Sequence, residues 1–294
     1  MNHTTPERED IRANDNPIGM DGIEFIEYAT SKPQALGQVL EMMGFRPIAR
    51  HRSREVMLYR QGEVNIIVNA HHAAHSQSAA PDEQPVIAAM ALRVRDAGVA
   101  YQRALDLGAW AVPTRVEVME LNIPAIHGVG QSRIYFVDRH RVFSIYDVDF
   151  VPIPGVDQHP PAQHGLHLFG LVQYIGNERT ADWTEFYQSL LGFETLPDAQ
   201  RFGILPKGRI LRSPCKGFHL QLIEPEPSVL DVEDDEHFQR LGLGTSDVAA
   251  TVTSLSAMGV EFVEHAHSTS QRAGALTRNW MGSVSFELVG HVKP

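Results

Sequence analysis

The chain repeats itself with a period of about 150 residues, and this feature limits its possible folds most strongly. The first copy begins at residues 22–45 (GIEFIEYATSKPQALGQVLEMMGF) and the second at residues 168–193 (LFGLVQYIGNERTADWTEFYQSLLGF). Both patterns are typical of a strand followed by a helix that ends at a Gly-Phe pair. A repeat of this length indicates two related domains rather than a stack of short units.

Apolar residues recur at helical spacing in both copies. Each predicted helix has them at positions i, i+3, i+4 and i+7, which places them on one face. They are Leu36, Val39, Leu40 and Met43 in the first copy and Trp183, Phe186, Tyr187 and Leu190 in the second. Ser31 and Gln34, with Pro33 between them, predict a capping box at the start of the first helix.

The two halves also match further along the chain. Residues 91–109 correspond to residues 242–260, and both segments predict a strand, a capping aspartate (Asp96 or Asp247) and a helix that stops at Gly108 or Gly259. Late strands are expected at 133–140 and 283–291, and middle strands at 55–69 and 217–225. Each half is therefore expected to hold two βαβββ modules. The predicted fold class is α+β, with strongly curved mixed sheets and helices on their outer faces.

Composition and linkers complete the expected organisation. We expect a flexible polar tail at 1–20, domains at 21–152 and 166–294, and a proline-rich linker at 153–165. The absence of any membrane-length apolar run argues against a membrane partner. The formal net charge of −11, without a basic stripe, argues against nucleic acid. A single cysteine, Cys215, and a polar N-terminus are typical of a cytoplasmic protein. The sequence leaves open whether the protein forms a homo-oligomer.

One carboxylate stands out in the last predicted strand, residues 283–291 (SVSFELVGH). Glu287 lies there between Phe286 and Leu288. Burying an acid in an apolar strand is costly unless the acid is paired, hydrogen-bonded or bound to a metal. Glu287 is therefore a candidate functional residue, and its partner has to be found elsewhere in the chain.

Several stretches of the chain resemble a known family. Residues 22–29, 50–70, 91–97 and above all 134–150 (IYFVDRHRVFSIYDVDF) resemble the N-terminal domain of 4-hydroxyphenylpyruvate dioxygenase. Residues 181–193, 210–225 and 245–260 resemble the catalytic domain of the same family. The resemblance implies two pseudo-symmetric domains of the vicinal oxygen chelate superfamily (glyoxalase/bleomycin-resistance-like). It also implies that the second domain holds the position of the catalytic site.

The resemblance also assigns positions to the metal ligands. The family binds Fe(II) through two histidines and one glutamate, which leaves open positions for a 2-oxo acid and oxygen. Glu287 occupies the glutamate position, while Gly170 and Arg240 stand where the histidines are expected. Glycine has no donor atom and arginine stays protonated, so only Glu287 is competent as a ligand and no metal is expected. The corresponding positions of the first half hold Phe25, Ala89 and Val137.

Arg240 suggests a replacement for the metal. Its guanidinium could form a bidentate ion pair with Glu287, or it could turn to solvent and leave Glu287 partly hydrated. His167 is a possible displaced ligand, because it lies three residues before Gly170. On a regular strand that odd spacing points it to the opposite face, unless a bulge shifts the register.

Three function classes follow from these observations. The leading one is a 4-hydroxyphenylpyruvate dioxygenase-like protein with a degenerate Fe(II) site that binds a small molecule, such as an aromatic or oxo acid, or acts as an interaction protein. The alternative is an active non-haem Fe(II) dioxygenase on an aromatic 2-oxo acid such as 4-hydroxyphenylpyruvate. The third is a metal-independent enzyme using Glu287 and a histidine.

The resemblance marks Gln239 and Ile223 as substrate-side positions. A cluster of three histidines, His71, His72 and His75, is expected to lie in a surface loop.

Overall fold

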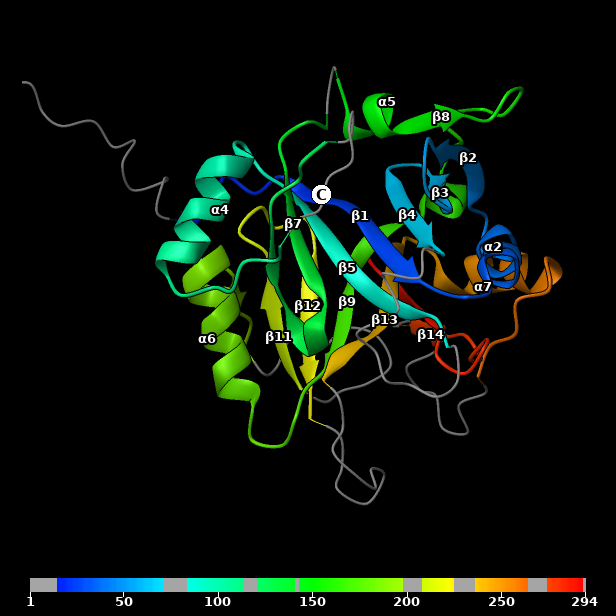
Figure 1. Ribbon diagram of the computed structural model, residues 1–294. Coiled ribbons are helices and arrows are strands. Elements are labelled where there is room, and N and C mark those ends of the chain that lie inside the picture. Colours follow the sequence, from blue (N-terminus) through cyan, green and yellow to red (C-terminus); the bar gives the residue numbers. More distant parts are fainter. Residues whose placement is uncertain are drawn as a thin grey trace, which may run out of the picture.

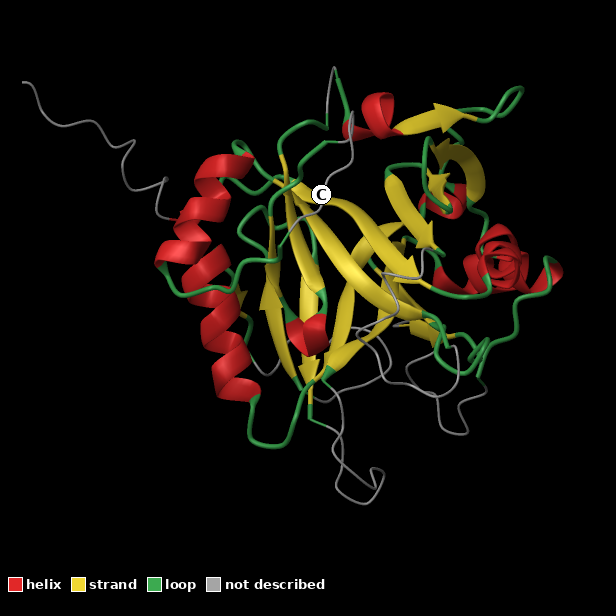
Figure 2. Cartoon of the chain, viewed as in Figure 1, coloured by secondary structure: helices red, strands yellow, loops and turns green. Residues whose placement is uncertain are grey.

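The computed structural model describes residues 15–70, 84–113, 121–140, 143–197, 208–224, 236–263 and 274–292. Two mixed β-sheets lie between two groups of helices (Figures 1 and 2), so the α+β fold class is confirmed. Each half contributes its own sheet, and no sheet of the described residues runs across both halves. Within the described residues, no helix has the length and the apolar character that crossing a membrane requires.

The first sheet has eight strands in the order β6-β7-β5-β1-β4-β3-β2-β8. They are β1 (Gly22–Ala29), β2 (Arg46–His51), β3 (Val56–Gln61), β4 (Val64–Asn69), β5 (Val86–Arg93), β6 (Ala125–His127), β7 (Arg133–Val137) and β8 (Phe150–Pro152). The helices of this half are α2 (Pro33–Met42), α4 (Ala97–Asp106) and α5 (Ile145–Asp149), with a 3-10 turn, η1 (Val129–Gln131). Strand β1 is parallel to β4 and β5 is parallel to β7, whereas β1 and β5 pair antiparallel at the centre.

The second sheet has seven strands in the order β10-β11-β12-β9-β13-β15-β14. They are β9 (His167–Tyr174), β10 (Glu194–Thr195), β11 (Arg209–Arg212), β12 (His219–Ile223), β13 (His237–Thr245), β14 (Gly274–Leu276) and β15 (Phe286–Gly290). Its helices are α6 (Thr180–Leu191) and α7 (Val248–Ala257), preceded by the turn η2 (Gln163–Gly165). The pairing repeats that of the first sheet: β9 is parallel to β12, β13 is parallel to β15, and β9 and β13 are antiparallel.

The modules follow the predicted pattern in part. The first module of each half is a βαβββ unit, β1-α2-β2-β3-β4 and β9-α6-β10-β11-β12. The second modules, β5-α4-β6-β7 and β13-α7-β14-β15, have two strands after the helix among the described residues. An isolated bridge stands in place of the third strand in each case, Ala111 with Ile126 and Phe262 with Thr277.

The helix starts test the predicted caps. Asp96 Oδ1 accepts a hydrogen bond from the Val99 amide at 2.8 Å, and Asp247 Oδ1 accepts one from the Ala250 amide at 3.0 Å. Both bonds satisfy an amide that the helix leaves unpaired, so both predicted caps are confirmed.

The predicted capping box at Ser31 is wrong. Helix α2 begins at Pro33, and the residue before it, Lys32, makes no capping hydrogen bond through its side chain. Instead, Thr30 Oγ1 accepts from the Lys32 amide at 3.0 Å. This local turn places the helix start one residue later than the box requires, and proline at the first position removes one amide that would need a partner.

One apolar core joins the two halves. It contains Ile26 and Leu36 from the first half and Leu171 and Tyr187 from the second. Strand β5 lies next to β13 and helix α4 lies beside α6 (Figure 1), and Met42 at the end of α2 comes close to Gly259 just after α7. The two sheets therefore share one hydrophobic core instead of forming two separate cores.

The N-terminal residues that the structure describes belong to this core. Ile18 and Met20 are buried in it, and the Asn16 side chain hydrogen-bonds both the amide and the carbonyl of Met20. The expected tail reached residue 20, but the described part of it, from residue 15, is packed. Two apolar side chains in an otherwise polar segment account for the difference.

Candidate functional site

A cavity of about 30 Å³ lies on one face of the second sheet, over strands β9, β12, β13 and β15. Its lining consists of Phe169, Gly170, Leu171, Val172, Ile210, His219, Gln221, Gly242, Glu287 and Val289. The strand register places His219, Gly170, Gly242 and Glu287 side by side in one row across the four strands. A single water needs roughly 10–15 Å³, so the cavity holds about two or three non-hydrogen atoms in this conformation.

Arg240 reaches Glu287 on the cavity side of the sheet. Strand β13 places Arg240 opposite Val172 and two residues before Gly242, and both of these residues line the cavity. Arg240 Nε donates to Glu287 Oε2 at 2.7 Å, and each side chain is 4% exposed. The predicted ion pair is therefore present, and the alternative of a solvent-facing Arg240 is wrong.

The geometry of the pair differs from the predicted bidentate one. The hydrogen bond runs through Nε, whereas Arg240 Nη2 is buried and has no hydrogen-bond partner among the described residues. A buried donor without a partner costs free energy, so this nitrogen needs an acceptor that the described side chains do not provide.

Gly170 marks a close approach of two strands. A Cβ added at Gly170 would lie 2.1 Å from the His219 carbonyl oxygen on β12. The contact is with backbone, so no side chain fits at this position unless the strands move. The neighbouring Gly242 differs, because its nearest contact would be an ordinary 3.4 Å. Gly170, the position that the resemblance assigns to the first histidine, therefore has no room for a side chain in this structure.

A bulge turns the start of β9 toward the cavity face. The register between β9 and β13 shifts between Gly242 and Leu243. As a result, Phe169 lines the cavity and the His167 ring lies directly over Gly244. Gly244 and Gly242 are alternate residues of β13 and so lie on the same face of the sheet. The bulge therefore brings His167 to the cavity face, as the sequence analysis required for a displaced ligand.

His167 nevertheless has other partners. Its Nδ1 lies 3.1 Å from the Gly165 carbonyl oxygen, and its Nε2 lies 2.9 Å from His291 Nδ1. A carbonyl can only accept, so Nδ1 of neutral His167 carries the proton and Nε2 accepts from His291. Burial lowers the pKa of His291, and the nearby His167 lowers it further. The pair fastens the residue after β15 to the beginning of β9.

His219 is the cavity residue that the sequence interpretation missed. It is 8% exposed and stacks on Phe169 with ring centroids 4.7 Å apart. Burial lowers its pKa to about 4, so the imidazole is neutral near pH 7. Strand alternation would have found it, because Leu220 and Leu222 face the core and leave His219 on the cavity side.

The remaining candidates lie away from the cavity. Gln239 accepts from His237 at 2.7 Å, Ile223 is buried, and neither lines the cavity. The His71, His72 and His75 cluster lies outside the described residues. Elsewhere in the part that is described, no group of three or more His, Cys, Asp or Glu side chains is arranged to hold a metal ion.

The interior of the first half is filled. Phe25 and Val137 belong to an apolar cluster that includes Ile145 and Phe150 from the segment after β7, and Ala89 is fully buried. These side chains occupy the inner face of the first sheet. The place that corresponds to the second-half cavity is therefore a packed core in the first half.

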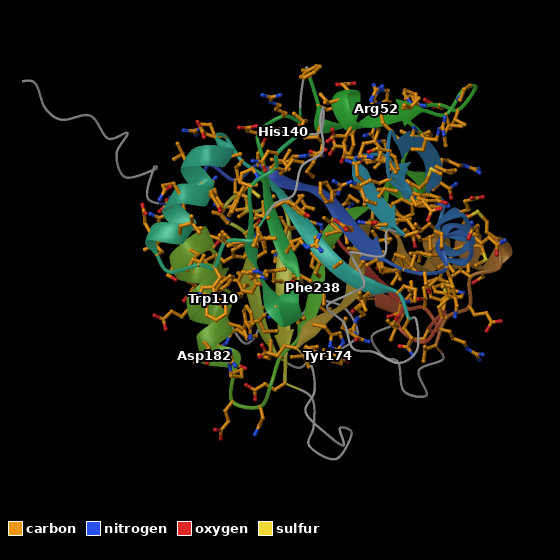
Figure 3. All side chains as sticks on the ribbon, viewed as in Figure 1. Arg52, Trp110, His140, Tyr174, Asp182 and Phe238 are labelled. Atoms are coloured by element: carbon orange, nitrogen blue, oxygen red, sulfur yellow. The ribbon has the colours of Figure 1, made fainter. Side chains whose placement is uncertain are left out.

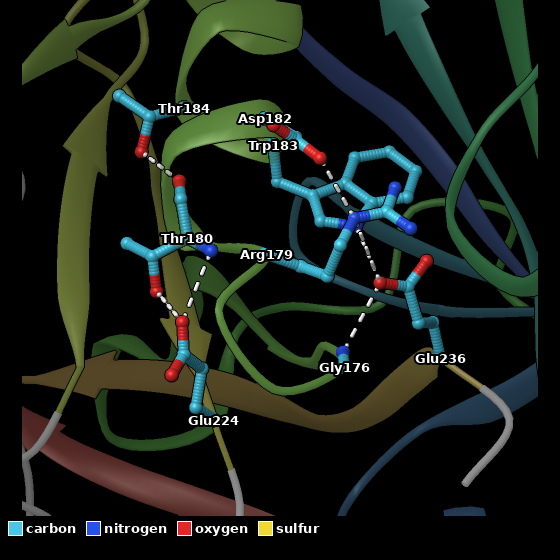
Figure 4. A network of polar contacts seen from close by, with 8 residues as sticks. All are labelled: Gly176, Arg179, Thr180, Asp182, Trp183, Thr184, Glu224 and Glu236. Carbon is cyan, nitrogen blue, oxygen red and sulfur yellow. Dashed lines mark hydrogen bonds and ion pairs between the residues drawn. The ribbon is translucent and has the colours of Figure 1, made fainter. Parts of the chain in front are cut away.

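Two further features of the structure lie outside the cavity. Glu236 accepts hydrogen bonds from Trp183 Nε1 at 2.8 Å and from the Gly176 amide at 3.1 Å, which fixes the first turns of α6 (Figure 4). Trp110 is 78% exposed and lies beside α4 and α6, away from Phe238 in the interior (Figure 3). Neither Glu236 nor Trp110 lines the cavity.

Two family descriptions match the chain. "Hydroxyphenylpyruvate dioxygenase, HPPD, N-terminal" matches residues 14–151, and "Glyoxalase/Bleomycin resistance protein/Dioxygenase superfamily" matches residues 157–276. The second match contains the strands β9, β12 and β13 of the cavity but ends before β15, the strand that carries Glu287.

Individual relatives agree with these matches. The 4-hydroxyphenylpyruvate dioxygenase of Pseudomonas sp. (strain P.J. 874) is 42% identical over 184 residues, which are 62% of this chain and 51% of that protein. The enzyme of the same name from Pseudomonas aeruginosa is 33% identical over 261 residues, 84% of this chain and 72% of that protein. The match thus spans about half the length of the first relative. A mutant of 4-hydroxymandelate synthase from Streptomyces coelicolor shares the fold, with a TM-score of 0.71 at 17% identity over 92% of both chains.

Proposed function

Because this chain belongs to the 4-hydroxyphenylpyruvate dioxygenase family, we propose that it is a member that binds a small molecule without iron. The observation that carries the proposal is the buried Arg240–Glu287 ion pair, 2.7 Å between Nε and Oε2. In this proposal the guanidinium supplies the positive charge that a metal ion gives the family's site. We keep domain limits of 21–152 and 166–294, a linker at 153–165 and a cytoplasmic location as parts of the same proposal.

The donor set supports the proposal. Of the three positions that the resemblance assigns to iron ligands, Gly170 has no donor atom and Arg240 carries a proton at every nitrogen. Glu287 alone could bind a cation, and it already accepts from Arg240. Fe(II) in this family requires three protein ligands. We therefore derive no chemical step through iron for these residues.

The active dioxygenase is the second candidate, and the 33% identity to the Pseudomonas aeruginosa enzyme favours it. Iron would then have to be held by Glu287 and by histidines outside the family positions, of which His219 lines the same cavity. The metal-independent enzyme would use the same two residues as an acid–base pair. In both candidates Glu287 would act through Oε1 or would have to leave Arg240, because its Oε2 accepts from Arg240 Nε, and leaving would strand a buried guanidinium.

Metal analysis after anaerobic loading with Fe(II) tests the proposal. We expect far less than one iron per chain, and no oxygen consumption with 4-hydroxyphenylpyruvate. The Pseudomonas aeruginosa relative, treated in parallel, serves as the positive control. Iron bound in equal numbers with the protein chains and lost on Glu287→Ala, or oxygen uptake that the same change abolishes, would establish the dioxygenase instead.

A further inference from the structure

A second pocket lies in the first half, apart from the cavity at Glu287. It has a volume of about 680 Å³ and is formed by the N-terminal segment 16–21 and by the residues that follow β5 and β7. His140, one of its lining residues, marks its place in Figure 3. Sites for small molecules usually have volumes of roughly 300–1,000 Å³, so this pocket has the size to accept a whole ligand.

Hydrogen bonds fix the wall that residues 16–21 form. The Asn16 side chain binds both the amide and the carbonyl of Met20, and the Arg95 amide donates to the Gly19 carbonyl at 3.0 Å. Gly19 has a φ of 61°, and a Cβ there would lie 2.8 Å from Arg95 Cβ. The Arg95 side chain therefore lies directly against a turn that glycine keeps open. A ligand meets a wall that is already ordered, which lowers the entropic cost of binding.

Two arginines and one phenylalanine line the pocket with exposed side chains. Strands β5 and β7 are parallel neighbours whose last pair is Arg93 with Val137, so Arg95 and Arg139 leave the sheet at adjacent points, each two residues further on. Neither guanidinium forms a hydrogen bond or an ion pair among the residues that the structure describes, so both are available to a ligand. Phe143 is 55% exposed and adds an aromatic face.

The two carboxylates of the lining offset these positive charges only in part. Asp138 Oδ2 accepts from the Ala97 amide at 3.1 Å, so its charge faces the positive end of helix α4. Asp21 is exposed, and water and salt screen its charge. A planar guanidinium matches two oxygens of a carboxylate or a phosphate. Two guanidinium groups together best match the nearly double negative charge of a phosphate monoester.

We propose that this pocket binds an aromatic phosphate monoester, with Arg95 and Arg139 on the phosphate and Phe143 against the ring. The proposal goes beyond the function proposed for the second half, because the pocket shares no lining residue with the cavity at Glu287.

Phenyl phosphate, benzoate and inorganic phosphate test the proposal at constant ionic strength. Shifts of the Gly19 and Arg95 backbone amides in ¹H–¹⁵N spectra report binding. We expect saturable shifts with phenyl phosphate and a Kd on the order of 1 mM, which is reasonable for so small a probe. Benzoate has the ring but a single charge, and inorganic phosphate has the charge without the ring. Each should bind at least about fivefold more weakly.

Three variants assign the contacts. Arg95→Gln and Arg139→Gln should each weaken the binding of phenyl phosphate at least about fivefold. Phe143→Ala should weaken the binding of phenyl phosphate but leave that of inorganic phosphate unchanged. Arg278→Gln and Trp110→Ala are the matched controls, because these side chains are 67% and 78% exposed and lie outside the pocket, and they should leave every affinity unchanged.

Three outcomes would overturn the proposal. They are the absence of a saturable shift with phenyl phosphate, unchanged binding of phenyl phosphate in both arginine variants, and binding of benzoate as tight as that of phenyl phosphate. All variants alter exposed side chains, and circular dichroism confirms that each one is folded before it is compared.

Discussion

Replacing the buried pair by apolar side chains of similar size measures how strongly Arg240 and Glu287 depend on each other. We expect Arg240→Met or Glu287→Leu alone to destabilise the protein by about 3–5 kcal/mol, because the surviving charge is left buried without its partner. The Coulomb attraction at 2.7 Å is about 6 kcal/mol with an effective dielectric constant of 20, which is enough to account for that loss. The double variant should return close to the unaltered stability, since it buries no charge.

Thermal unfolding followed by circular dichroism is a suitable assay. For 294 residues the unfolding entropy is about 0.6 kcal/mol/K, so each single variant should lower the Tm by about 5–8 °C. The exposed pair Arg278–Glu261 is the control, and the same substitutions there should change stability by less than about 0.5 kcal/mol each.

Additivity is the result that refutes the reasoning. Coupled neighbours give a double variant that loses much less than the sum of the single losses. If the losses at Arg240 and Glu287 simply add, the two side chains do not depend on each other. Glu287 would then be stabilised by another group.

Three further predictions concern the cavity and a helix start. The pKa of His219 is about 4 in the folded protein against about 6.5 unfolded, so the unfolded chain binds more protons between these two values. Urea melts should therefore show full stability above about pH 6.5 and a loss of up to about 3 kcal/mol toward pH 4, and His219→Phe should abolish this pH dependence. Gly170→Ala should lower the free energy of unfolding by at least about 1–3 kcal/mol in the same melts, whereas Gly242→Ala, which makes only ordinary contacts, should lower it clearly less. Equal losses for the two variants would contradict the close approach of β9 and β12. Asp247→Ala should remove about 1 kcal/mol by loss of the α7 cap, with the same loss for Asp96→Ala in α4, and no loss would show that the caps are dispensable.

The sequence predicted those parts of the fold that depend on periodicity and local hydrogen bonding. The repeat predicted the two sheets, because matching strand and helix patterns form matching topology. Asp96 and Asp247 predicted helix starts, because a cap is made within one turn. The predicted capping box at Ser31 was wrong because Thr30 accepts the hydrogen bond of the Lys32 amide at the same turn. The sequence pattern alone does not show which of two neighbouring short polar side chains will bind a backbone amide.

The site was predictable in its ion pair but less so in its shape. The family positions suggested the Arg240–Glu287 pair but left open whether Arg240 turns to solvent, and only the burial of both side chains decides between the two. The bulge in β9 is a backbone irregularity without a sequence signature here, and it alone decides that His167 lies over Gly244. The contact between Gly170 and the β12 backbone likewise depends on how closely two strands approach in three dimensions.

The contacts between the halves come in equivalent sets. Exchanging the halves turns α4 into α7 and α6 into α2. The α4–α6 contact therefore corresponds to the approach of Met42, at the end of α2, to Gly259 just after α7, and β5 against β13 corresponds to itself. The polypeptide is thus built like a homodimer whose subunits have been joined end to end. In a true homodimer every substitution alters both subunits, but here each interior can diverge alone. The first has filled with Phe25 and Val137, whereas the second holds the Arg240–Glu287 pair, so the two interiors differ in chemistry although they share one topology.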